Sequence, residues 1–286
     1  MATFFGEVVS AYSRAVEEGD DDSEEEENEE DREIRNEIQK KREVHVHWNP
    51  EITNSIDTSS TKAFQCSDLI LAAGPNAAGF LSAFVLSSGS WETVGSVTLW
   101  NERCKTTANQ QLPAGPSCVF HRPTDKPDVL ICQCTCHVAE DQLFQWAEKV
   151  LGSIQKTGLT VTVLSDCSVA EYKTPDSVST IPVPFLRALK TRHYKEAPHC
   201  PLLEQPNVIT GLPAAVLSHC QVFGIPAVLY QCYSDVVKPD SVTMEAYKPT
   251  VSCRSLSRVM KLDSSESVDI LKKLVRVNEA QSNLYT

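Results

Sequence analysis

The sequence lacks a basic patch with interleaved aromatic residues, which is the pattern typical of a nucleic-acid-binding surface. Its formal net charge of −12 comes from one segment, because residues 17–33 carry thirteen acidic residues and one arginine. The other residues hold twenty-five acidic and twenty-five basic side chains. The composition therefore predicts a neutral globular body behind an acidic leader, and we expect no nucleic-acid partner.

Unbroken apolar runs long enough to cross a membrane are also missing. Two uncharged runs, 69–91 and 212–230, have the length, but Gly-Pro-Asn at 74–76 and Gly-Ile-Pro at 224–226 divide them. We interpret the first as strand–turn–helix and the second as helix–turn–strand. The first ten residues, MATFFGEVVS, have no basic region before an apolar stretch, so we expect no signal or transit peptide. The eleven cysteines are then expected to be reduced thiols in a cytosolic protein.

Motifs of common catalytic and nucleotide-binding sites are absent, because no Gly-x-Ser-x-Gly, His-Glu-x-x-His or Gly-x-Gly-x-x-Gly occurs. GPNAAGF at 74–80 follows a predicted strand as a phosphate loop would, but it lacks the glycine spacing and the Lys-Ser or Lys-Thr ending. We interpret it as a tight turn in which Asn76 caps the next helix. We expect no enzyme and no cofactor, although residues far apart in the sequence could still meet as a catalytic triad.

The densest cysteine pattern is CQCTCH at 132–137. In a strand, Cys132, Cys134 and Cys136 would point to one face, about 7 Å apart per step. Thiolates bound to one zinc ion lie much closer together. We therefore interpret the three as small buried apolar side chains and expect no bound metal. The alternative is a thiol–metal protein, which stoichiometric zinc in the purified chain would support.

Hydrophobic periodicity predicts an α/β domain with a central sheet flanked by helices. The predicted strands cover 43–48, 67–74, 94–100, 117–122, 128–138, 158–165 and 225–233. The predicted helices cover about 31–41, 76–89, 139–152, 184–190, 212–224 and 264–280. We therefore expect a disordered acidic leader over 1–40, a single domain over 41–280 and a free tail over 281–286.

The leader is expected to stay solvated, because a run of like charges repels itself. The simplest interpretation is a solubilising segment. Ser23, which is followed by four glutamates, is also a candidate phosphorylation site for acid-directed kinases.

The final residues Leu284, Tyr285 and Thr286 are the candidate partner-binding site. Two apolar side chains follow the polar stretch EAQSN, which can act as a flexible stalk. A terminal carboxylate is an anion that a lysine or backbone amides can bind, and tyrosine supplies a large contact area with a hydroxyl group. The alternative is an inert frayed end.

A hydrophobic residue, a tyrosine and any last residue resemble the tail with which proteasome activators and assembly factors enter pockets between α subunits of the 20S core. Further segments resemble the proteasome assembly chaperone family, and this resemblance runs essentially from residue 1 to residue 286. These segments are MATFFGEVV, LWNE, CQCTCHVAEDQ, PFLRALKT, CPLLEQPN, LPAAVLSHCQV and ILKKLVRVNEAQSNLYT.

The resemblance implies a non-catalytic protein that pairs with a second assembly chaperone as a heterodimer. It implies that the heterodimer binds proteasome α subunits, promotes formation of the α ring and prevents α rings from dimerising. It also implies a cytoplasmic protein with some peripheral association with the endoplasmic reticulum. Carried over to this sequence, Leu284 would fill the apolar part of a pocket, Tyr285 would pack at its rim, and the Thr286 carboxylate would pair with a lysine.

One alternative from another class remains, which is an α/β enzyme of hydrolase or nucleoside-processing type. Fold class alone does not decide between the two. A cleft with convergent polar groups and a nucleophile would favour the enzyme, whereas a flat apolar face and a free tail would favour the chaperone.

Overall fold

The computed structural model describes residues 28–59, 62–87, 89–100, 118–174, 181–235, 239–260, 267 and 269–273. The chain divides into two units, Met1–Lys41 and Arg42–Thr286. In the first unit, helix α1 (Glu29–Lys41) confirms the helix predicted near 31–41, and its acidic first turn suits the positive end of the helix dipole. The sequence predicts a disordered leader over 1–40; residues 1–27 of it lie outside the described residues, and α1 occupies most of the remainder.

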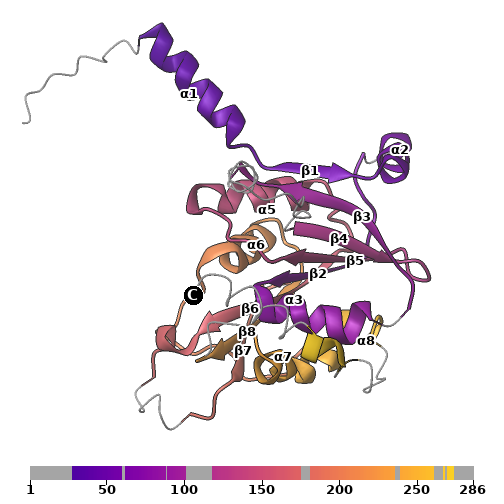
Figure 1. Cartoon of the computed structure of the whole chain (residues 1–286), viewed down its shortest axis with the longest axis vertical. Helices are drawn as coiled ribbons and strands as arrows, with labels where there is room; N and C mark the ends of the chain where they lie inside the picture. The colour runs from indigo at the N-terminus through magenta and orange to yellow at the C-terminus, as the bar shows by residue number, and fades with distance from the viewer. Residues whose placement is uncertain are drawn as a thin grey trace, which may run out of the picture. The chain divides into compact units, whose positions relative to one another are not determined.

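The second unit is built on a mixed sheet whose eight described strands follow the order β1-β3-β4-β5-β2-β6-β8-β7 (Figure 1). The strands are β1 (His45–Trp48), β2 (Asp68–Ala73), β3 (Trp91–Thr98), β4 (Cys118–Pro123), β5 (Val129–Cys134), β6 (Thr160–Ser168), β7 (Phe185–Lys190) and β8 (Ala227–Ser234). The neighbours β5, β2, β6 and β8 run parallel, and antiparallel strands extend the sheet on both sides. All six residues of β2 are buried, as expected for a central parallel strand.

Helices cover both faces of this sheet. Because side chains alternate along a strand, Leu69 and Leu71 of β2 join one core cluster and Ile70 and Ala72 join the other. Helices α5 (Leu143–Gly152) and α6 (Gly211–Val222) pack into the first cluster. Helices α3 (Pro75–Leu81), α7 (Ser241–Ala246) and α8 (Arg254–Ser257) pack into the second. The predicted α/β fold with a central sheet between helices is confirmed.

Several shorter elements complete the domain. They are helix α2 (Pro50–Thr58), the π-helical turn η1 (Ser82–Leu86), and the 3-10 turns η2 (Glu140–Gln142), η3 (Val169–Glu171) and η5 (Lys248–Ser252). Helices α2, α7 and α8 were not predicted from the sequence. The helix predicted over 264–280 is described at residue 267 and residues 269–273, which are helical, and Leu271 is buried in the second cluster.

The two long uncharged runs have the structures that the sequence predicts. The first forms β2 followed by α3, and the second forms α6 followed by β8. In the part of the chain that the structure describes, no helix combines the length and the hydropathy required of a membrane span.

The helix predicted over 184–190 is wrong, because this segment is strand β7. It pairs antiparallel with β8, from Phe185 opposite Tyr233 to Lys190 opposite Val228. Leu186 and Ala188 consequently face the core. Leucine, arginine, alanine and lysine favour a helix locally, but the long-range pairing with β8 outweighs a propensity of a few tenths of a kcal/mol per residue.

Candidate functional site

The residues that the sequence selects as functional lie outside the described part of the chain. Leu284, Tyr285 and Thr286 follow the last described segment, and Ser23 precedes α1. Leu271, in that last segment, is buried in the same core cluster as α3 and α7. The described chain thus reaches the core at Leu271. Three other regions of the domain carry groups with possible functional chemistry.

The first region is a pocket of about 230 Å³ where the central parallel strands end. Ligands of open α/β sheets generally bind at this edge, so an enzyme would be expected to use it. Asp166 and Cys167 of β6 line the pocket with Gln231 of β8 and with His137 and Thr210. The sequence does not predict this grouping, because its members come from separate strands and loops.

Asp166 is partly buried there and is held by three groups from other elements. Its carboxylate accepts hydrogen bonds from the backbone N–H of Asn76 (2.7 Å), the backbone N–H of Ala77 (3.1 Å) and the hydroxyl of Tyr247 (2.7 Å). Burial raises the pKa of Asp166 to about 6, and these hydrogen bonds oppose the shift. The carboxylate thus caps the first turn of α3, where an anion is favoured.

The prediction that Asn76 caps α3 is wrong. Asn76 lies inside the first turn, after Gly74 and Pro75, and its side-chain oxygen accepts a hydrogen bond from the backbone N–H of Asp240 (2.9 Å). Gly74 has a φ of 114°, and a Cβ there would lie 2.5 Å from Asp166 Oδ2. The glycine is needed for this close approach, and Asp166 occupies the place that a phosphate group would take.

The same pocket holds a cysteine, Cys167, that an enzyme could use as a nucleophile. Catalytic cysteines react as thiolates. Burial and the neighbouring Glu171 carboxylate raise the pKa of Cys167 to about 12, so it keeps its proton at neutral pH. The Asp166 carboxylate is already hydrogen-bonded to the start of α3 and to Tyr247. This pocket therefore does not supply the activated nucleophile that the enzyme alternative requires.

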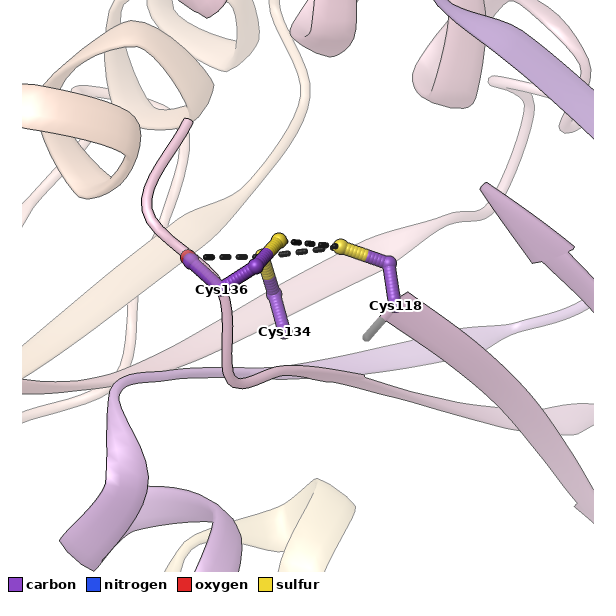
Figure 2. Close-up of side chains that lie close together, drawn as sticks. All are labelled: Cys118, Cys134 and Cys136. Carbon is purple, nitrogen blue, oxygen red and sulfur yellow. Dashed lines mark hydrogen bonds between the residues drawn. The ribbon is translucent and has the colours of Figure 1, made fainter. Parts of the chain in front are cut away.

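The second region is a group of three thiols, Cys118, Cys134 and Cys136, shown in Figure 2. The strand predicted over 128–138 ends at Cys134, where the backbone oxygen of Cys134 accepts a hydrogen bond from Gly74 (3.0 Å). Cys136 therefore follows the strand instead of lying on its face. The predicted row of Cys132, Cys134 and Cys136 is wrong at its last member.

The sequence does not predict that Cys118 belongs to this group. Cys118 comes from β4 and lies directly opposite Cys134 of β5. The Sγ atom of Cys118 is 2.9 Å from that of Cys134 and 3.6 Å from that of Cys136, and the last two are 3.8 Å apart. Hydrogen bonding to Cys134 and Cys136, followed by burial, raises the pKa of Cys118. The Cys118 thiol therefore keeps its proton at neutral pH when nothing else is bound.

The third region is the edge of the sheet at β7, which we call the edge surface and define by Tyr172, Phe185, Arg187, Leu202 and Glu204. The Arg187 guanidinium lies 4.8 Å from the ring centre of Phe185 and 5.4 Å from that of Tyr172. It also forms an ion pair with Glu204 (3.1 Å). Leu202 is exposed beside this group. Tyr172 is itself buried, so Phe185, Arg187 and Leu202 are the side chains that a partner could contact. Aromatic, arginine and exposed aliphatic side chains together are typical of surfaces that bind proteins.

Further exposed apolar side chains lie at the start of α5 and at the end of α6. Phe144 of α5 is 68 % exposed, and Val222 and Phe223 at the end of α6 are 78 % and 53 % exposed. In contrast, every residue of β8 is buried. Strand β8 is therefore core, so any apolar partner contact in the sequence region 212–233 has to use the outer end of α6.

Comparison with known proteins shows to which family the chain belongs. The family model described as proteasome assembly chaperone 4 matches residues 1–286. Proteasome assembly chaperone 1 of Xenopus laevis is 61% identical over 288 residues, with both chains fully covered. Proteasome assembly chaperone 1 of Homo sapiens is 49% identical over 288 residues, covering 100% of this chain and 99% of that protein.

Solved structures share the fold at low sequence identity. An archaeal homologue of proteasome-assembly chaperone from Pyrococcus furiosus aligns with a TM-score of 0.53 at 12% identity, over 85% of this chain and 100% of that one. A Thermoplasma acidophilum protein of unknown function aligns with a TM-score of 0.56 at 13% identity, over 83% and 96% of the two chains. Full-length matches in sequence, supported by this shared fold, show that the chain belongs to the proteasome assembly chaperone family.

Proposed function

We propose that the chain is a chaperone for assembly of the 20S proteasome and acts by binding, without catalysis. The observation that carries this proposal is the identity of 61% over the whole chain with a relative named proteasome assembly chaperone 1. The structure is consistent with it, because the pocket at the ends of the parallel strands has its carboxylate committed to the fold and its thiol protonated.

In this proposal the chain forms a heterodimer with a second assembly chaperone, and the pair binds proteasome α subunits. It promotes formation of the α ring and prevents α rings from dimerising. The protein works in the cytoplasm, with a peripheral fraction at the endoplasmic reticulum. Phosphorylation of Ser23 would add charge to an already acidic leader, so its effect would be on long-range attraction and repulsion and not on the fold.

The tail supplies one of two contacts. Leu284 enters the apolar part of a pocket, Tyr285 packs at the rim, and the Thr286 carboxylate pairs with a lysine of the α subunit. A weak peptide contact gains affinity when a folded body holds it at high effective concentration. Body and tail together then bind more tightly than either alone, and each can be released separately, as an assembly factor that must later leave requires.

The test is binding of the reconstituted heterodimer to the 20S core and to α-ring intermediates. Intact chain is compared with a deletion of residues 284–286 and with Tyr285→Ala. We expect both changes to weaken binding by about tenfold to a hundredfold, the loss of about 1.4 to 3 kcal/mol that a buried anchor contributes. Binding that survives both changes would show that the tail is accessory.

In that case, Leu202→Asp on the edge surface and Phe223→Asp at the end of α6 would locate the body contact. Each places a charge at one exposed apolar side chain and leaves the other intact. Failure of the intact heterodimer to bind either particle would overturn the proposed function.

A further inference from the structure

The thiols of Cys118, Cys134 and Cys136 form a group that the chaperone function does not use. In the described part of the chain, they are the set of three potential metal-ligating side chains whose ligand atoms all lie within 4.8 Å of one another. They come from β4, from the end of β5 and from the residue after Thr135, so backbone at two strands and a loop converges on one point (Figure 2). Such convergence from separate elements is how folded proteins build metal sites.

The spacing of the sulfur atoms suits one tetrahedral ion. With metal–sulfur bonds of about 2.3 Å, two thiolates on a zinc ion lie about 3.8 Å apart. The Cys136 sulfur is already 3.6 Å from that of Cys118 and 3.8 Å from that of Cys134. The remaining separation, 2.9 Å between Cys118 and Cys134, has to widen by about 0.9 Å to reach this value. The 2.9 Å between these two sulfur atoms is also far longer than a disulfide bond of about 2.05 Å, so both thiols are free to bind an ion.

Charge decides which class of cation fits. Binding breaks three S–H bonds, releases three protons to solvent and forms three metal–sulfur bonds. A divalent ion leaves a net charge of −1 on the site, whereas a monovalent ion leaves −2. Cys118 and Cys134 are buried, and burial of uncompensated charge is costly, so the divalent ion is favoured. Thiolates are soft ligands, which excludes the hard cations Mg²⁺ and Ca²⁺.

An ion can reach the cluster. Cys134 and Cys136 line the pocket of about 230 Å³ at the ends of the parallel strands, together with His137. Cys136 is only partly buried. A water molecule from that pocket can complete four-coordination. An ion so held would tie the loop after β5 to β4, which is a structural role next to the turn that carries Gly74.

We propose that Cys118, Cys134 and Cys136 together bind one divalent thiophilic cation such as Zn²⁺. The test uses the full chain, reduced and freed of metal with a chelator, and titrated with Cd²⁺ as a spectroscopic probe. We expect one equivalent of Cd²⁺ to produce thiolate-to-metal charge-transfer absorption, Zn²⁺ to compete for the site, and affinity to fall as pH is lowered because protons compete for the thiolates.

The decisive variant is Cys136→Ser, because this residue is the most accessible of the three. We expect it to weaken binding by more than about 100-fold, beyond the loss that removal of an outer-shell partner causes. Cys200→Ser is the matched control, since Cys200 is also partly buried but does not belong to the cluster. A circular-dichroism spectrum of each metal-free variant checks the fold.

A second measurement on unaltered chain keeps the test decisive even if Cys136→Ser fails to fold. Bound Zn²⁺ should slow alkylation of Cys136 and leave alkylation of Cys200 unchanged, as measured by mass spectrometry of the peptides. The proposal is overturned if Cd²⁺ gives no absorption, if Zn²⁺ does not protect Cys136, or if Cys136→Ser binds as tightly as the unaltered chain. Recovery of a Cys118–Cys134 disulfide with no metal bound by the reduced chain would also overturn it.

Discussion

Among single residues, Asp166 combines partial burial with hydrogen bonds from segments that precede and follow it in the chain. Its pKa rises from an ordinary value of 3.8 to about 6 because burial disfavours the charged form. The folded protein therefore holds a proton on Asp166 more tightly than the unfolded chain does. The stabilisation that this difference provides is complete below pH 3.8 and is lost as the pH rises through 6.

Asp166→Asn removes this titration and leaves the other ionisable groups in place. We expect the free energy of unfolding of the unaltered chain, relative to that of the variant, to fall by about 2 kcal/mol between pH 4 and pH 6. Urea denaturation of both proteins at several pH values measures the difference. A difference that stays constant across this range would show that Asp166 has an ordinary pKa.

At the scale of elements, the junction between β2 and α3 depends on a residue without a side chain. Gly74→Ala would force a Cβ into a position 2.5 Å from the Asp166 carboxylate, at a backbone φ of 114° that other residues rarely adopt. We expect a loss of about 2 to 3 kcal/mol in the free energy of unfolding, measured by urea denaturation.

The matched control is Gly152→Ala at the end of α5. A Cβ at Gly152 meets no atom within 4 Å, and its φ lies outside the left-handed region. We expect this change to be neutral or to stabilise by up to about 1 kcal/mol, because alanine favours a helix more than glycine does. Equal effects of the two changes would contradict the role assigned to Gly74.

Another junction is electrostatic and links the segment after α8 to the start of β2. The Arg258 guanidinium contacts the carboxylates of Asp68 and Asp128 (2.6 Å to the latter), and Ser255 donates to Asp68 (2.7 Å). Asp68 is buried, whereas Arg258 is about one-third exposed. Arg258→Met would leave the Asp68 carboxylate without its cation.

We expect Arg258→Met to cost about 2 kcal/mol, below the 3 to 5 kcal/mol of a fully buried pair because solvent screens the arginine. Thermal unfolding measures the loss. Lys272→Met is the control, since Lys272 and Asp269 form an exposed pair at 4.0 Å, and a change of at most about 0.5 kcal/mol is expected. A similar loss of stability in both variants would show that the ion pairs of Arg258 contribute no more than an exposed pair does.

Local sequence patterns predict a strand or helix when the periodicity within that one segment decides which of its side chains face the core. The alternation in 43–48 and the apolar stripe of α5 are examples, and the sheet with helices on both faces follows from them. Segment 184–190 is mispredicted because its pairing with β8 is decided by residues about forty positions away. The cap of α3 by Asp166 bridges ninety positions. Cys118 and Cys134 meet only because β4 and β5 pair in one register. Such contacts leave no local pattern.

For the whole molecule, the exposed apolar groups bear on the proposed heterodimer. Phe144, Val222, Phe223 and Leu202 are each more than half exposed on the described surface. Exposed apolar surface that a partner normally covers promotes self-association when the partner is absent. We expect the purified chain alone to self-associate at micromolar concentration. A monodisperse, stable monomer in sedimentation-velocity experiments would count against an obligate pair.

The order of the strands in the sheet also determines how long one strand waits for its partner during synthesis. Strand β7 lies at the edge of the sheet and pairs with β8, which the ribosome makes after the loop, the turns and all of α6 that separate them. At usual elongation rates, these roughly forty residues take about 2 to 8 s to emerge. During that interval β7 has been made and its partner strand has not. The paired edge of the sheet is therefore completed only once β8 has been made, and until then β7 can pair only with the segment around Leu202 that follows it.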